Sequence, residues 1–327
     1  MVDQVRSTWN DSISLGLVFP AAFPQFASGE GNILDTLASC FADRFFGAVE
    51  MGPIADSKQR AEVAGFVKER GLGCVYLAGI PILRERLNLS AIDEAVRWSA
   101  VRRVVSMIDE AFQLGACLML VSSGPDPGVH LRERALEQLA KSLSTICRCA
   151  EDYSVEAPLM ITLEHYDRDI DKRFLLGPSA VTAEFVRALK SEHPNLGITL
   201  DQSHICQLGE SPEMALGHLA DLVAHVHLAN CVISNPLSQL YGDQHVPFGI
   251  EEGECGDDEV HEFLRALMNS GYFSRPNSAG SAIVSLEVRP PAGTDPWTVL
   301  AQSKATFERA WMRLPERVTP TSTRLRI

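Results

Sequence analysis

The sequence has 327 residues, of which 46% are hydrophobic and 22% charged, and its formal net charge is −13 at pH 7. Such an acidic chain repels nucleic-acid phosphates and anionic membrane surfaces, so we expect neither as a partner. No run of about 18 apolar residues is present, and the opening MVDQVRSTWNDS lacks the charged and apolar regions of a signal peptide. The length suits one large α/β barrel or two smaller domains.

Short apolar segments predict eight β-strands, and the amphipathic stretches that follow them predict helices. The expected strands are 12–19, 46–51, 74–79, 117–123, 159–165, 197–202, 223–229 and 282–288. The expected helices are 31–44, 56–70, 90–114, 131–152, 179–192, 211–221, 257–271 and 295–313. Helix starts are indicated by Asp56, Ser179 and Ser211 with Pro212. Gly71, Gly115 and Gly271 fall where helices should end.

Eight strands alternating with eight helices are typical of a (β/α)8 TIM barrel. The rival, a doubly wound open sheet, would usually carry a Gly-rich phosphate turn after an early strand, and none is present. We predict a single-domain barrel over residues 1–314. Its loop at 230–256 is too long for a routine connection and is a candidate lid or substrate loop. Residues 315–327 form a polar tail, which is either disordered or an arm onto a partner subunit.

Eight cysteines are scattered along the chain, and none belongs to a C-x-x-C pair. Several lie in apolar runs, where a reduced cysteine behaves as a small hydrophobic residue. This distribution predicts a reduced, cytoplasmic protein without a disulfide framework. Cys147 and Cys149 could form a redox or metal-binding pair, but packing within a helix is the favoured interpretation because no partner ligands lie nearby in sequence.

Ionisable residues mark the ends of the last four predicted strands. Glu164 lies at the end of the fifth strand, Asp201 of the sixth and Glu287 of the eighth, and the seventh strand contains both His225 and His227. In a barrel of this kind, the carboxyl ends of the strands carry the chemistry. Strand alternation turns their leucine neighbours toward the helices and the three acids toward the barrel interior.

Three converging carboxylates would repel one another, and a divalent cation resolves that conflict. Three oxygen donors and one nitrogen suit Mn²⁺, Mg²⁺ or Co²⁺ better than a thiolate-type zinc site, and we expect one ion, with Mn²⁺ favoured and Zn²⁺ still open. Each residue alone has a simpler interpretation, since a strand-end Glu commonly pairs with a basic residue and His225 could be a core histidine.

At these residues the sequence resembles the xylose-isomerase-like superfamily of (β/α)8 barrels, and most of all the sugar isomerase/epimerase branch that includes D-tagatose 3-epimerase. The resemblance implies that Glu164, Asp201, His227 and Glu287 bind the metal and that Glu164 and Glu287 also act as the acid/base pair. It implies that His204, three residues after Asp201, contacts the substrate.

Further site residues follow from the same resemblance. Glu50 is similar to an acid at the end of strand two that often lies near the substrate. His245, with Pro247 and Gly249, resembles the family's loop after strand seven. Arg289 is a candidate for a distal hydroxyl or carboxylate of the substrate, or for an ion pair with a neighbouring acid. Dimers and tetramers are common among such barrels, so a homo-oligomer is compatible with the sequence.

The resemblance implies an isomerase or epimerase of carbohydrate metabolism that acts on a sugar or sugar-like keto/hydroxy compound through a metal-stabilised enediolate. Two substrate-contacting positions depart from the ketohexose 3-epimerase pattern: Ile233 replaces an Arg and Ile170 replaces a Glu. The resemblance therefore carries the family's metal centre over to this sequence, but it does not carry over the family's substrate. In the long loop we expect most of the acids Asp243, Glu251, Glu252 and Glu254 to be solvated.

Three alternatives remain open. The same metal site could serve a lyase, dehydratase, hydratase or decarboxylase acting on a keto-sugar or keto-acid. An apurinic endonuclease of the same superfamily would need more metal ligands and a basic face. A non-catalytic binding barrel would have no need of the intact set of four ligands.

Overall fold

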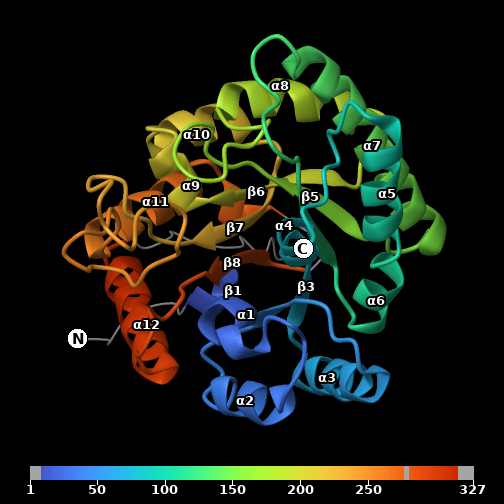
Figure 1. Cartoon of the computed structure of the whole chain (residues 1–327). Helices are drawn as coiled ribbons and strands as arrows, with labels where there is room; N and C mark the ends of the chain where they lie inside the picture. Colours follow the sequence, from blue (N-terminus) through green and yellow to red (C-terminus); the bar gives the residue numbers. More distant parts are fainter. Residues whose placement is uncertain (1–8, 276–279, 316–327) are drawn as a thin grey trace, which may run out of the picture.

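The structure is a computed structural model that describes residues 9–275 and 280–315. Its eight parallel strands close into a barrel in sequence order, with β8 hydrogen-bonded to β1. The strands are β1 (Ile13–Val18), β2 (Ala48–Met51), β3 (Gly73–Leu77), β4 (Leu118–Ser122), β5 (Met160–Glu164), β6 (Leu196–Asp201), β7 (Val223–Leu228) and β8 (Ala282–Leu286). Figure 1 shows the strands in the middle of the molecule with the helices around them. The predicted TIM barrel is confirmed.

Every region that was expected to be helical contains a helix. The α-helices are α1 (Phe19–Ala22), α2 (Ile33–Cys40), α3 (Ser57–Arg70), α4 (Gly79–Arg84), α5 (Glu94–Val105), α6 (Ile108–Gln113), α7 (Arg132–Tyr153), α8 (Ser179–Lys190), α9 (Gln202–Gln207), α10 (Pro212–Leu219), α11 (Asp257–Asn269) and α12 (Pro296–Met312). The single helix expected at 90–114 is instead two, because a tight turn at Ser106 and Met107 separates α5 from α6.

Side chains at the helix ends explain most of the boundaries. The Asp56 carboxylate accepts a hydrogen bond from the Gln59 amide and caps α3, and Ser211 does the same for α10. Gly71 ends α3 in the left-handed region, at φ +65°. Ser179 is not a cap; it is the first residue of α8, and its amide donates to Glu210 instead.

Three short helices follow strand ends directly and were not predicted. Helix α1 begins after β1, α4 after β3 and α9 after β6. Each has four to six residues, which is too short for a helical period to show in the sequence. They matter for function because they stand at the carboxyl ends of the strands, where a barrel enzyme has its active site.

The core has a main part and smaller separate parts. Outward-facing strand residues such as Leu163, Leu200 and Leu286 are buried against the helices in the main core, as expected from strand alternation. A separate apolar cluster lies at the carboxyl ends of the strands in the first half of the barrel; we call it the mouth cluster. It consists of Val18, Ala21, Leu77 and Leu120, with Ile80 packed against them.

The loop at 230–256 contains no helix or strand, but its two ends are tied together. The Asn230 side chain donates to the Pro247 carbonyl and accepts from the Cys255 amide. An isolated bridge joins Val232 to Gly242. The loop is therefore an ordered wall beside the barrel mouth.

Other expectations concern the chain ends, the thiols and the membrane. Residues 316–327 of the expected tail lie outside the described residues. None of the eight cysteines forms a disulfide bond in the structure, and Cys147 and Cys149 both lie on α7. Within the described part of the chain, no helix is long and apolar enough to cross a membrane.

Candidate metal centre

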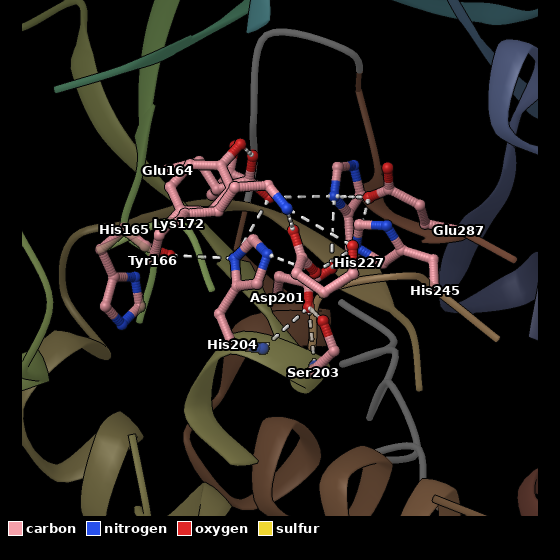
Figure 2. Close-up of polar contacts among 12 residues, drawn as sticks. Glu164, His165, Tyr166, Lys172, Asp201, Ser203, His204, His227, His245 and Glu287 are labelled. Atoms are coloured by element: carbon pink, nitrogen blue, oxygen red, sulfur yellow. Dashed lines mark hydrogen bonds and ion pairs between the residues drawn. The ribbon is translucent and has the colours of Figure 1, made fainter. Parts of the chain in front are cut away.

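Four strand ends bring three carboxylates and one imidazole together. The barrel register places Asp201 of β6 directly opposite His227 of β7. His227 Nδ1 lies 2.7 Å from Glu287 Oε2, 3.3 Å from Glu164 Oε1 and 3.6 Å from Asp201 Oδ2. One donor atom from each of the four residues lies within 4.8 Å of the other three. The set predicted from sequence is thus brought to one place (Figure 2).

Glu164 and Asp201 each have one carboxylate oxygen held by hydrogen bonds and one without a hydrogen-bond partner among the described residues. Tyr166 donates to Glu164 Oε2 at 2.5 Å, and Glu164 Oε1 has no hydrogen-bond partner among the described residues. Asp201 Oδ1 accepts hydrogen bonds from the Ser203 amide and hydroxyl and from the His204 amide. Asp201 Oδ2 is left without a partner, like Glu164 Oε1. Both free oxygens point toward His227.

The opposite side of His227 is held by Glu50. His227 Nε2 lies 3.1 Å from Glu50 Oε2, and His225 Nε2 lies 2.8 Å from Glu50 Oε1. The other ring nitrogen of His225 lies 3.2 Å from Thr199 Oγ1, which in turn donates to Thr162. This chain of contacts forms a buried layer beneath the four donors. It fixes the tautomer that leaves His227 Nδ1 facing the carboxylates, a common arrangement for metal-binding histidines.

The charges of the centre are strongly coupled. Burial lowers the pKa of His227, but the carboxylates of Glu50 and Glu287 outweigh burial and raise that pKa well above its ordinary value. Burial raises the pKa of Glu287, but the imidazoles of His245 and His227 outweigh it and bring the pKa to about 2. Burial raises the pKa of Asp201. Without a cation, the protein needs a proton on His227 to hold this group of acids together.

The residues present fit a divalent cation. Among the described residues, Glu164 Oε1 and Asp201 Oδ2 are buried and have no hydrogen-bond partner, and both face His227 Nδ1. Such orphaned atoms are costly unless an ion satisfies them. Three carboxylate oxygens and one imidazole nitrogen, with no thiolate, form a set that suits Mn²⁺, Mg²⁺ or Co²⁺.

A second polar group adjoins the first and shares Asp201. His204 Nε2 lies 3.2 Å and His245 Nε2 3.3 Å from Asp243 Oδ1, and His245 Nε2 is 3.9 Å from Asp201 Oδ2. One donor atom each of Asp201, His204 and His245 falls within 4.8 Å of the others. However, Lys172 Nζ lies 2.9 Å from Asp243 Oδ2. The lysine already supplies a positive charge to this second group.

Asp243 is not solvated, whereas Glu251 and Glu252 are exposed, as expected for most of the loop acids. Its side chain is 2% exposed. Burial raises its pKa, but His245, His204 and Lys172 together hold the pKa well below the ordinary value. The burial of Asp243 could not be predicted because Lys172 lies 71 residues earlier in the chain, and no local pattern could show that contact.

Asp167 builds the turn that presents Lys172. This fully buried carboxylate accepts hydrogen bonds from the backbone amides of four residues, which are Ile170, Asp171, Lys172 and Arg173. The turn forces Arg173 into the left-handed region, at φ +53°. Asp167 and Lys172 were both missed by sequence reasoning, although an acid just after a strand-five ligand is a usable signal for such a turn.

A cavity of about 310 Å³ opens beside the donors. Glu164, His227 and Glu287 line it, whereas Asp201 does not. The polar side chains on its wall are those of Arg84, Glu164, Tyr166, Lys172, His227, Asp243, His245, Glu287 and Arg289. This size is at the lower end of small-molecule sites.

Two of the four expected substrate contacts lie on the cavity wall and two do not. His245 and Arg289 line the cavity. Glu50 is fully buried with both oxygens engaged by histidines, because it lies beneath the centre and not at the mouth. His204 is 1% exposed; its Nδ1 contacts the His165 carbonyl and its ring packs against Tyr166. The structure thus places Glu50 and His204 behind the cavity wall.

These features define a closed (β/α)8 barrel with a carboxylate–imidazole centre at the carboxyl ends of β5 to β8. Residues 43–303 match the family model of the xylose isomerase-like TIM barrel. The chain belongs to that family.

Several solved structures share the fold. A D-tagatose 3-epimerase-like protein aligns with a TM-score of 0.65 and 20% identity, covering 92% of this chain and 97% of the other. The IolI protein with a bound zinc atom has a TM-score of 0.67 and 15% identity over 91% and 98% of the two chains. The 3-keto-D-glucoside 4-epimerase of E. coli has a TM-score of 0.60 and 17% identity over 90% and 99%. No curated protein matches the sequence significantly.

Proposed function

We propose that this protein is a divalent-metal-dependent isomerase or epimerase of a sugar-like α-hydroxycarbonyl compound. The observation that carries the proposal is the convergence of one donor atom each from Glu164, Asp201, His227 and Glu287, with Glu164 Oε1 and Asp201 Oδ2 buried and without a hydrogen-bond partner among the described residues. Glu164, Asp201, His227 and Glu287 would hold the ion, and the donor set favours Mn²⁺. Epimerases among the structural neighbours agree with this reaction class.

The protein's own residues supply the acid and the base. A bound divalent cation would supply Lewis-acid stabilisation of the charge that develops on the substrate's carbonyl oxygen. The Glu287 carboxylate lines the cavity and can take the α-proton. Glu164 also lines the cavity, and after it takes up a proton from solvent it can deliver that proton to the opposite face or to the neighbouring carbon. Tyr166 keeps Glu164 in place through its hydrogen bond.

Polar side chains around the donors would position the substrate. Lys172, His245 and Arg289 line the cavity and can bind its oxygens. We assign positioning roles to Glu50, which orients His227, and to His204, which faces Asp243. Asp201 is a ligand but does not reach the cavity, so it takes no part in proton transfer.

A lyase or dehydratase is the second candidate, because an enediolate can also expel a neighbouring hydroxyl. The phenol of Tyr166 lies next to Glu164. Burial, and to a smaller extent the Glu164 carboxylate, raise the pKa of this phenol well above its ordinary value. A phenol that remains protonated can donate to a leaving oxygen. Isomerisation conserves the mass of the substrate, whereas elimination does not.

The test is an exchange assay in deuterium oxide with a panel of ketoses and keto-acids. Metal-loaded protein should incorporate deuterium at the carbon next to the carbonyl of at least one compound, with unchanged carbon skeleton. Chelation should abolish the exchange and Mn²⁺ should restore it. Exchange that survives exhaustive chelation would refute the proposal, and product of lower mass would favour the lyase.

A further inference from the structure

The cavity wall is divided sharply between the two halves of the barrel. All eight lining residues that lie on or after β5 carry ionisable side chains. Of the ten that come from the first half of the chain, only Arg84 has a polar side chain. The second half therefore offers hydrogen bonds and charge, and the first half offers a hydrocarbon surface.

The apolar side is a built surface. Val18, Leu77 and Leu120 are contributed by β1, β3 and β4, and each is at most 5% exposed. Together with Ala21 and Ile80 they form the mouth cluster, which is separate from the main core. The nearby Leu83 on α4 also lines the cavity and is 38% exposed. The strand residues of the cluster are already buried, whereas Ile80 is half-buried and Leu83 is exposed, so these two side chains leave apolar surface that an apolar part of a ligand would cover.

A polyhydroxylated sugar fits such a wall poorly. Hydroxyl groups turned toward Leu77, Leu120 and Ile80 would lose water without gaining a hydrogen bond, and each such loss is costly. Aromatic rings that commonly stack on the C–H face of a sugar are also absent from this half of the described wall.

We propose that the substrate is amphipathic: an α-hydroxycarbonyl head faces the donors on β5 to β8, and an apolar tail or ring lies on the mouth cluster. This inference rests on the proposed function for the reactive head of the substrate, and it adds that the remaining part of the substrate is apolar. The mouth cluster is then the specificity-determining surface. An aliphatic or aromatic substituent on a keto-sugar head meets this requirement, whereas a free hexose does not.

Two hydroxamates of equal chain length test this directly. Both hexanohydroxamate and gluconohydroxamate present a metal-chelating head that resembles an enediolate, but the first has an alkyl tail and the second a polyhydroxy tail. Calorimetry on the Mn²⁺-loaded protein should show that hexanohydroxamate binds at least about tenfold more tightly. The chelated protein serves as the blank for non-specific binding.

Variants of the mouth cluster locate the preference. Ile80→Gln, at a half-buried position on α4, should narrow the affinity ratio between the two hydroxamates, and Leu120→Asn should do so more strongly. Met214→Gln on α10 is the matched control, because Met214 is 58% exposed and does not line the cavity. Ile80→Gln keeps the test valid if Leu120→Asn fails to fold.

The outcomes separate this inference from the proposed function. Equal binding of the two hydroxamates, or tighter binding of gluconohydroxamate, would overturn the amphipathic substrate even if deuterium exchange occurs with a polar ketose such as L-erythrulose. Preferential, metal-dependent binding of hexanohydroxamate without exchange of any panel compound would support the apolar subsite and count against the isomerase. Failure of both hydroxamates to bind the metal-loaded protein would overturn both.

Discussion

Glu50 Oε2 lies 3.1 Å from His227 Nε2, and on the far side of the same ring Nδ1 lies 2.7 Å from Glu287 Oε2. The ring is thus held between an acid that is fully buried and one that borders the cavity. Since Glu50 also engages His225, a single carboxylate on β2 orients two histidines of β7. The orientation of His227, a proposed metal ligand, thus depends on Glu50, which does not contact the substrate.

Glu50→Gln should lower metal affinity by about 10- to 100-fold, because an amide no longer fixes the tautomer or strengthens the basicity of His227. Titration of the chelated protein with Mn²⁺ measures the change. Glu110→Gln is the control. Like Glu50, Glu110 accepts a hydrogen bond, here from the Ile54 backbone amide, but it lies away from the metal centre. Unchanged Mn²⁺ affinity in Glu50→Gln would show that Glu50 only fills space.

Glu287→Gln should leave the barrel folded, weaken metal binding and abolish deuterium exchange. The amide cannot accept the α-proton, and its nearest contact, His227, loses a charged neighbour. Circular dichroism, metal titration and the exchange assay measure the three effects. Glu251→Gln, which changes an exposed acid of the 230–256 loop, is the control. Full exchange activity in Glu287→Gln would rule out Glu287 as the base.

Metal analysis of the purified protein should give one tightly held divalent ion per chain. The second group, Asp201 with His204 and His245, has suitable donors, but the Lys172 ammonium sits 2.9 Å from the adjoining Asp243 and repels a further cation. Elemental analysis against protein concentration gives the ratio. A ratio of two would mean that the second group also binds metal despite the lysine.

Asp167→Asn should destabilise the protein by about 2 kcal/mol, because the turn at 167–173 loses charged hydrogen bonds to four amides and an amide donor then faces them. Limited proteolysis should cut this turn faster, and Lys172 should lose its contact with Asp243. The neighbouring exposed Asp169 offers a control in Asp169→Asn. Equal stability and equal cleavage of the two variants would contradict the assigned role.

A pH dependence of stability is expected from the pair of Asp126 and Arg132. The guanidinium of Arg132, 2.6 Å away, lowers the pKa of Asp126 below its ordinary value of 3.8. A carboxyl whose pKa is lowered by folding stabilises the native state above the unfolded pKa and loses that effect as the pH falls through the native one. Asp126→Asn should therefore cost about 0.5–1 kcal/mol at neutral pH and progressively less below pH 3.8.

Denaturant unfolding of the chelated protein at a series of pH values measures this difference. Asp126 also lies close to the site, because its backbone amide donates a hydrogen bond to the carbonyl of Arg173, the residue after Lys172. A cost that stays constant as the pH falls would show that Asp126 acts through packing and not through its charge.

The strands and the four donors could be predicted because both leave local marks. Parallel barrel strands are buried on both faces, so they stand out as short apolar runs, and an acid at the end of such a run is conspicuous. Asp201 illustrates this: its side chain is a proposed ligand and also caps α9 through Ser203 and His204. The turn from strand to helix thus sets the donor in place.

The rest of the site depends on contacts between distant segments. Lys172 meets Asp243 across the mouth, and Glu50 reaches His225 from the other side of the barrel. The sequence contains no period or spacing that links such pairs. The mouth cluster escaped notice for a different reason, since Val18 and Leu77 look like any other strand residues until the barrel closes and turns them toward the cavity.

The distribution of roles around the barrel bears on how this protein could change during evolution or in the laboratory. The proposed catalytic residues lie on or after β5 to β8, and the apolar wall is built by β1, β3 and β4. Replacing the N-terminal half of the barrel with the corresponding half of a relative would therefore change the substrate selectivity and keep the reactive centre. Glu50 on β2 is the exception, because it supports His227 from the other half. A transplanted N-terminal half would have to bring an acid at that position.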